Sequence, residues 1–121
     1  MPFGDISDLV ASTYGIGTER VAVVRDVTDL PPREADAVGV EVEVREGGEF
    51  RTDLTIYNAP NGVSEREAAM KMATSSARRC LIDDGDGNPY SRCLISVDGS
   101  ISSVKLDGDV LDEEEAFSLA A

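Results

Sequence analysis

The clearest pattern in the chain is a period-two alternation of apolar and polar residues near its middle. The apolar positions are Val38, Val40, Val42 and Val44, followed after two glycines by Phe50, Thr52, Leu54 and Ile56. This alternation predicts an antiparallel hairpin with one buried face. Because opposed residues project to the same side of a sheet, we expect the three-residue loop Glu46-Gly47-Gly48. That loop sets Val44 opposite Phe50 and Arg45 opposite Glu49.

Three stretches favour helices. An apolar stripe over residues 5 to 14 predicts a short helix, with Asp5 as its N-cap and Gly15 as its stop. Ser64-Glu-Arg-Glu67 is typical of a capping box that opens a longer helix, and the inner stripe of that helix is expected to reach Cys80. The acidic run 112–115 is expected to cap a closing helix that carries residues 116–119, with its acids at the positive end of the helix dipole.

Two further strand regions complete the prediction. The β-branched run 21–27 predicts a strand, and residues 92–106 predict a second hairpin around Asp98-Gly99. A tight turn there pairs Cys93 with Val104, whereas a three-residue loop pairs Leu94 with Val104, and both registers stay open. The element order is then α-β-β-β-α-β-β-α. We expect one α+β domain over residues 1–121, a two-layer sandwich with an antiparallel five-stranded sheet.

Acidity is the main feature of the composition. The 121 residues include 24 acids and 11 bases, which gives a formal net charge of -13. This surplus repels nucleic acid and anionic membranes and attracts basic proteins, so we expect no direct nucleic-acid partner and no membrane partner. High-salt adaptation or a GC-rich genome would produce the same composition without any acidic binding site.

The acids are concentrated late in the chain and provide a candidate site. Residues 1–79 carry a net charge of -5 and residues 80–121 a net charge of -8. If the loop after the long helix, the turn at Asp98 and the segment 107–115 converge, they form an anionic patch for a basic protein partner. The candidate partner-binding residues are Asp83, Asp84, Asp86, Glu113, Glu114 and Glu115. The alternative, separate solvated loops, is favoured by sequence alone.

The residue types present argue against most catalytic and metal chemistry. The chain has no histidine, which removes the commonest general base and the usual Ser-His and Cys-His pairs, so we expect no enzyme and no cofactor. The loop 84–88 begins like an EF-hand loop, but Pro89 and Ile95 stand where a glycine and a bidentate glutamate are required, so no metal site is expected. Cys80 and Cys93 are expected to stay reduced.

Targeting signals are not visible in the sequence. The first residues lack the basic and apolar regions of a secretory signal, and no apolar run approaches the roughly 20 residues of a membrane-spanning helix. We therefore expect a cytoplasmic protein, or a virion component if the protein is viral.

The predicted element order, the small size and the low pI of about 4.2 resemble those of the class I type III secretion chaperones. These are dimeric proteins that bind effectors. The resemblance lies in architecture and charge rather than in a motif, and it implies a homo-oligomer that binds a protein partner. No residue role follows from it.

Three classes of function are consistent with the sequence. The leading hypothesis is a non-enzymatic protein-binding or assembly module, a small acidic accessory or viral structural protein that uses a sheet face or edge. The second is an anionic inhibitor or immunity-type protein that blocks a basic nucleic-acid enzyme. The third is a carboxylate-dependent enzyme, which would require a pocket with two acids of strongly perturbed pKa.

Overall fold

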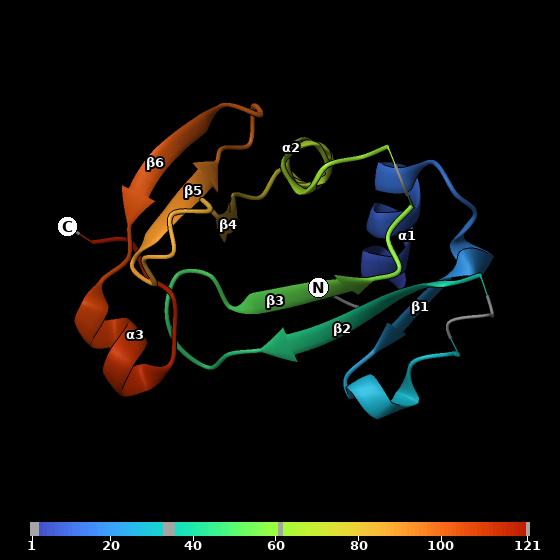
Figure 1. Ribbon diagram of the computed structural model, residues 1–121, viewed down its shortest axis with the longest axis horizontal. Helices are drawn as coiled ribbons and strands as arrows, with labels where there is room; N and C mark the ends of the chain where they lie inside the picture. The colour runs from blue at the N-terminus through green and yellow to red at the C-terminus, as the bar shows by residue number, and fades with distance from the viewer. Residues whose placement is uncertain (1–2, 33–35, 61, 121) are drawn as a thin grey trace. The chain divides into compact units, whose positions relative to one another are not determined.

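The computed structural model describes residues 3–32, 36–60 and 62–120 (Figure 1). These residues form three α-helices, two short 3-10 helices and two three-stranded sheets. The chain divides into two compact units. Unit 1 is Met1–Glu43 with Thr52–Ser64, and unit 2 is Val44–Arg51 with Glu65–Ala121. The predicted α+β class is confirmed, but the predicted single five-stranded antiparallel sheet is wrong.

Unit 1 combines one helix with a sheet of strand order β1-β2-β3. Its elements are α1 (Phe3–Tyr14), η1 (Thr18–Arg20), β1 (Val21–Val24), η2 (Val27–Asp29), β2 (Val38–Val44) and β3 (Thr52–Tyr57). Gly15 ends α1 as predicted, with a φ of 66°, and the Ile16 N–H donates to the Ala11 carbonyl at 3.0 Å. Asp5 lies inside the first turn rather than at the cap, because the helix already begins at Phe3.

The first sheet is mixed rather than antiparallel. β1 pairs with β2 in parallel, with Val21 opposite Val38 and Val24 opposite Glu41. A parallel pair needs a crossover of a dozen residues or more, and the chain between the two strands is long enough to provide one. The antiparallel expectation was therefore wrong for this pair. β2 and β3 do run in opposite directions (Figure 1).

Branched aliphatic side chains form the core of unit 1. Ile6 and Val10 of α1 and Val38 and Val40 of β2 are at most 2% exposed. The predicted buried face of the hairpin is therefore confirmed at Val38, Val40 and Val42, whereas Val44 is 68% exposed. The other face is also covered at Gly39, where an added Cβ would lie 2.6 Å from Cδ2 of Leu30.

The connection between β2 and β3 is longer than predicted. Residues 45–51 separate the two strands, and the Arg45 N–H donates to the Arg51 carbonyl at 2.7 Å. The expected three-residue loop with Val44 opposite Phe50 is therefore wrong. The physical reason is that the backbone of this loop pairs with a distant segment of unit 2, described below.

Unit 2 places a helix against a second sheet, of strand order β4-β5-β6, with both neighbouring pairs antiparallel. Its elements are α2 (Glu65–Ser76), β4 (Cys80–Asp83), β5 (Ser91–Ile95), β6 (Ile101–Lys105) and α3 (Gly108–Glu114). Ala69 and Ala73 of α2 pack on Ile95 of β5. These small helical side chains let the helix lie close to the sheet.

β4 is a strand that the sequence pattern missed. α2 ends at Ser76, because Ala77 adopts a φ of 53° and the Arg78 N–H donates to the Ala73 carbonyl at 3.2 Å. Cys80, expected at the end of the helix, instead begins β4. Its side chain still packs against the cluster that contains Ala73. The apolar character of Cys80 therefore fits a buried position, but it does not distinguish a helix from a strand. Burial raises the pKa of its thiol, and the thiols of Cys80 and Cys93 are both free.

The β5–β6 hairpin follows neither of the predicted registers. Ile95 lies opposite Ile101, and the loop is Val97-Asp98-Gly99. The Gly99 N–H donates to the Ser96 carbonyl at 2.9 Å, and Gly99 has a φ of 88°. A three-residue loop is thus present, but it begins one residue earlier than expected, since glycine must occupy its left-handed third position.

The closing helix also begins earlier than predicted. Asp107 caps α3, and its Oδ1 accepts hydrogen bonds from the N–H groups of Asp109 and Val110 at 3.0 and 3.3 Å. The expectation of a helix over residues 116–119 is wrong, because Glu115 turns into the left-handed region with a φ of 50° and ends α3. The acidic run 112–115, expected at the positive N-terminal end of a helix dipole, therefore lies at the negative C-terminal end of α3.

Candidate functional site

The structure places all six candidate acids in unit 2. Asp83 is the last residue of β4, and its Oδ1 accepts a hydrogen bond from the Gly85 N–H at 2.9 Å. Oδ1 of Asp84 accepts one from the Asp86 N–H, also at 2.9 Å. These bonds close two successive turns, so Asp83 and Asp84 have a local structural role in addition to their charge.

Glu113, Glu114 and Glu115 are exposed at the end of α3. The loop after β4 is tied to this helix, because the Tyr90 hydroxyl donates to the two carboxylate oxygens of Asp112 at 3.1 and 2.9 Å. This hydrogen bond, and then the charge of Asp112, raise the pKa of Tyr90. Two of the three acidic segments are thus linked.

Within the described residues, no group of three or more His, Cys, Asp or Glu side chains could hold a metal ion.

The third acidic segment lies elsewhere. Asp98 occupies the turn at the opposite end of the β5–β6 hairpin (Figure 1), so it lies apart from the other two segments, as in the alternative of separate loops that the sequence favoured. Its Oδ1 accepts hydrogen bonds from the backbone N–H and the hydroxyl of Ser100 at 2.9 and 2.7 Å. These bonds lower the pKa of Asp98, the backbone bond more than the hydroxyl bond.

The charge is distributed differently by unit than along the sequence. The sequence of unit 1 contains ten acids and three bases, a net charge of -7, and that of unit 2 contains fourteen acids and eight bases, a net charge of -6. The late acids share a unit with the bases of α2 and of the loop 45–51. Sequence position alone therefore exaggerated the local charge surplus.

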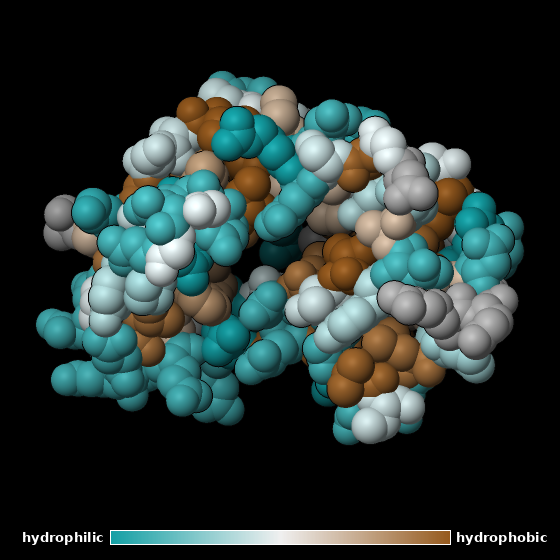
Figure 2. Space-filling model, viewed as in Figure 1, coloured by the Kyte–Doolittle hydropathy of each residue, from teal (hydrophilic) through white to brown (hydrophobic). Residues whose placement is uncertain are grey.

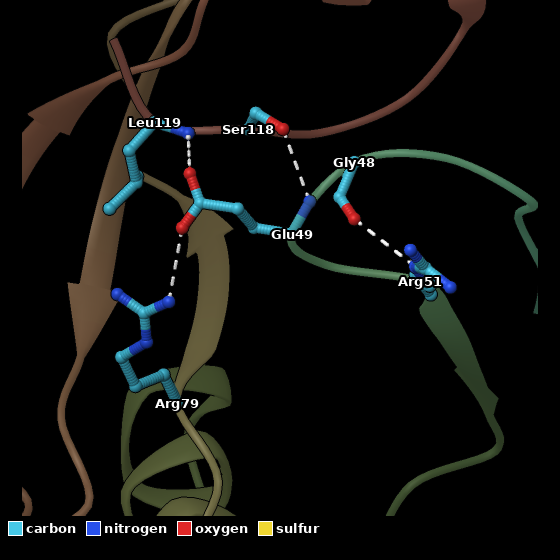
Figure 3. Close-up of polar contacts among 6 residues, drawn as sticks. All are labelled: Gly48, Glu49, Arg51, Arg79, Ser118 and Leu119. Carbon is cyan, nitrogen blue, oxygen red and sulfur yellow. Dashed lines mark hydrogen bonds and ion pairs between the residues drawn. The ribbon is translucent and has the colours of Figure 1, made fainter. Parts of the chain in front are cut away.

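A polar cluster around Glu49 joins the loop 45–51 to residues 116–120, which we call the C-terminal segment (Figure 3). One carboxylate oxygen of Glu49 lies 3.2 Å from the Arg79 guanidinium, and the other accepts a hydrogen bond from the Leu119 N–H at 3.0 Å. The Glu49 N–H donates to the Phe117 carbonyl at 2.8 Å. Gly48 and Phe50 both form bridges to Phe117. These contacts explain the length of the loop.

Arg45 binds the same part of unit 2. Its Nη1 donates to the Glu115 carbonyl at 2.7 Å, and its guanidinium lies 4.6 Å from the centre of the Phe117 ring. A cation at the end of α3 offsets the acids gathered there. The sequence pattern predicts that Arg45 pairs with Glu49 across a hairpin. In the structure Arg45 binds Glu115 and Glu49 binds Leu119, each of them 70 residues further along the chain. No local signal could have revealed them.

The C-terminal segment covers only one end of the outer edge of β6. The Ala120 N–H donates to the Lys105 carbonyl at 2.9 Å, and the Asp107 N–H donates to the Ser118 carbonyl at 2.8 Å. Backbone groups alternate in direction along an antiparallel strand, so those of Ile101 and Ser103 point away from β5, like those of Lys105. Within the described residues, no hydrogen bond reaches these outward groups of Ile101 and Ser103.

We call residues 101–104 the free edge of β6. β6 is an outer strand of its sheet, and none of these four residues is charged or a proline. Ser102 and Ser103 are exposed, as are Ile101 at 37% and Val97 in the adjoining turn at 49%. Hydrophobic surface interrupts the hydrophilic surface over this hairpin (Figure 2). An uncharged strand beside an Asp-Gly turn is the signal that could have identified this edge.

A small polar cavity of about 210 Å³ lies in unit 1. It is lined by Arg20, Asp36, Ala37, Val38, Asn58, Ala59 and Pro60. Arg20 and Asp36 form an exposed ion pair at 3.2 Å, and the Asn58 amide donates to the Ala37 carbonyl at 3.0 Å. Asp36 is the one carboxylate among these described lining residues. The cavity therefore lacks the pair of acids that the carboxylate-enzyme hypothesis requires.

No protein-family model, no curated protein and no solved structure matches this chain. The resemblance to secretion chaperones rested on an eight-element order, but the described residues include the additional strand β4 and two separate sheets. Within the same residues, no helix is long and apolar enough to cross a membrane.

Proposed function

We propose that this protein is a non-enzymatic protein-binding module that receives an extended strand of a protein partner along the free edge of β6. The observation that carries the proposal is the outward row of backbone groups at Ile101 and Ser103, which have no hydrogen-bond partner within the described residues. Such a row is a template for a further strand, which main-chain hydrogen bonds hold in place.

The sequence of the free edge supports this role. Edge strands that must stay unpaired are usually protected by a charge, a proline or a bulge, and residues 101–104 contain none of these. Lys105 is the first charged residue, and it lies where the C-terminal segment already pairs with β6. That pairing supports the proposal, since the same edge already accepts an extended segment at one end.

The acids of unit 2 favour a second candidate, an anionic inhibitor of a basic protein. The hydrogen bond between Tyr90 and Asp112 holds the loop containing Asp84 and Asp86 beside α3, so acids from two segments share one region. Binding through these acids would weaken with salt, and the charge reversals Asp86→Lys and Glu114→Lys would reduce it. Strand addition would resist both changes, which separates the two candidates.

Amide hydrogen exchange of the dilute protein tests whether the edge is available. The N–H groups of Ser102 and Val104 point toward β5 and should be protected, whereas those of Ile101 and Ser103 should exchange rapidly. Protection of Ile101 and Ser103 in the dilute monomer would mean that the edge is already occupied, and it would overturn the proposal.

A synthetic strand tests binding directly. A short peptide that alternates threonine with valine should shift the NMR signals of residues 101–104, and a matched peptide with proline at alternate positions should not. The variant Ser103→Pro removes one outward N–H group without removing a hydrogen bond to β5, so it should lose the response. Equal binding by the wild type and this variant would contradict strand addition.

A further inference from the structure

We infer that the C-terminal segment limits access to β6, and that a partner strand pairs with residues 101–105 by displacing Ala120 from Lys105. The inference rests on the proposed function, because it concerns how the same edge is opened to its partner. It follows from the shortness of the free edge, the weak attachment of Ala120 and the direction in which the C-terminal segment already runs.

The free edge alone offers few hydrogen bonds to a partner. Its outward backbone groups belong to Ile101 and Ser103, which together can form about four hydrogen bonds with another strand. Strands in globular proteins usually have about five or six residues. The next outward groups along β6 belong to Lys105, whose carbonyl accepts a hydrogen bond from the Ala120 N–H at 2.9 Å. A partner strand of ordinary length therefore requires the place that Ala120 occupies.

Ala120 is held less firmly than the residues before it. Ala120 is exposed, and the bond to Lys105 is its one hydrogen bond within the described residues. By contrast, the Phe117 carbonyl accepts two backbone N–H groups of the loop 45–51, and the Leu119 N–H donates to a carboxylate of the same loop at 3.0 Å. Ala120 can therefore leave Lys105 while the contacts of Phe117 and Leu119 stay in place.

The existing pairing also sets the orientation of the partner. Leu119 lies antiparallel opposite Leu106, so Ala120 occupies the position opposite Lys105 in an antiparallel ladder. A partner strand that takes over this position in the same direction begins opposite Lys105 and ends opposite Ile101. Because Leu119 stays opposite Leu106, the partner chain must turn away from the sheet before its first paired residue. The Lys105 carbonyl then exchanges one backbone donor for another, and the Ala120 N–H passes into water.

A peptide titration with the variant Ala120→Pro tests the inference. Proline removes the N–H group that binds the Lys105 carbonyl and leaves the free edge unchanged. A peptide that alternates threonine with valine and is long enough to span residues 101–105 should bind this variant about fivefold more tightly than the wild type, because one competing hydrogen bond is lost. Ala120→Thr is the matched control. It keeps the N–H group at an exposed position and should bind the peptide as the wild type does.

The NMR signal of the Ala120 amide provides a second measurement, on the wild-type protein. As the peptide saturates the edge, this signal should move toward its position in an unstructured chain, and the amide should exchange faster with solvent. The Leu119 amide should keep its protection, because Glu49 still accepts its hydrogen bond. Binding that shifts Ile101 and Ser103 but leaves Ala120 in place, with equal affinity for the wild type and Ala120→Pro, would overturn the inference and leave the proposed function intact. A peptide that binds neither protein would overturn both.

Discussion

Units 1 and 2 carry nearly the same net charge, but different interactions organise them. Unit 1 buries branched aliphatic residues from α1 and β2, among them Ile6 and Val40, both fully buried. In unit 2, the small side chains of Ala69 and Ala73 pack with Ile95, which is fully buried. Small side chains remove less apolar area from water, so unit 2 should depend more on hydrogen bonds between distant segments.

The sharpest test of this comparison is to truncate one core residue in each unit. Ile95→Ala and Ile6→Ala should each lower the free energy of unfolding by about 3 to 4 kcal/mol, since both side chains are fully buried and leave a cavity. Urea denaturation measures the loss, and amide exchange locates it. Ile95→Ala should reduce protection in α2 and β5, and Ile6→Ala should reduce it in α1 and β2.

The two variants also show whether the units unfold separately. If each unit unfolds by itself, the loss of protection stays within the unit that carries the substitution. An equal loss of protection throughout the chain in both variants would contradict this division and would show one cooperative unit.

The second prediction concerns the backbone contact between Gly48 and Phe117 in unit 2. Gly48 has a φ of 84°, and an added Cβ would lie 2.6 Å from the Phe117 carbonyl oxygen. Gly48→Ala should therefore lower the free energy of unfolding by about 2 to 3 kcal/mol through backbone strain and a steric clash with the backbone. Thermal unfolding measures the change, and amide exchange of Phe117 should report the local opening.

Gly47→Ala is the matched control for Gly48→Ala. At Gly47 the nearest atom to an added Cβ is the Cβ of Ala116 at 3.8 Å, an ordinary contact. This variant should change the free energy of unfolding by less than about 1 kcal/mol. Equal effects of the two substitutions would mean that the pairing with Phe117 contributes little to unit 2.

The sequence predicts the parts of the fold that depend on neighbouring residues. The valine face of β2, the stop of α1 at Gly15 and the beginning of α2 near Ser64 all follow from local spacing and backbone preference. Asp107 could also have been recognised as a cap, since an aspartate before a short helical run is a common N-terminus.

The parts that escaped prediction depend on distant partners. The register of the loop 45–51 is set by Phe117 and Leu119, whose positions no local pattern reveals. The parallel pairing of β1 with β2 depends in the same way on a crossover rather than on the two strand sequences. An uncharged strand beside an Asp-Gly turn is visible in the sequence, but where the free edge of β6 ends depends on the distant contact of Ala120 with Lys105.

The smallest expected effect is on the pKa values of two tyrosines, Tyr57 in unit 1 and Tyr90 in unit 2. Hydrogen bonding to Asp112 raises the pKa of Tyr90, whereas desolvation is the largest cause of the raised pKa of Tyr57, followed by the charge of Glu41. A raised tyrosine pKa favours the neutral phenol in the folded protein. Its stabilising effect is therefore complete below the ordinary value of 10.0 and is lost as pH rises through the folded-state pKa.

Ultraviolet titration of the phenolate separates the two tyrosines. Asp112→Asn removes the charged acceptor, so the pKa of Tyr90 should fall toward 10.0, while Tyr57 should titrate as in the wild type. Tyr90→Phe assigns its transition, because it removes one of the three phenols and leaves those of Tyr14 and Tyr57. If Asp112→Asn leaves the titration of Tyr90 unchanged, the bond does not hold the loop after β4 against α3. The acids at Asp84 and Glu114 would then lose the contact that links their segments, and the inhibitor hypothesis would lose its structural support.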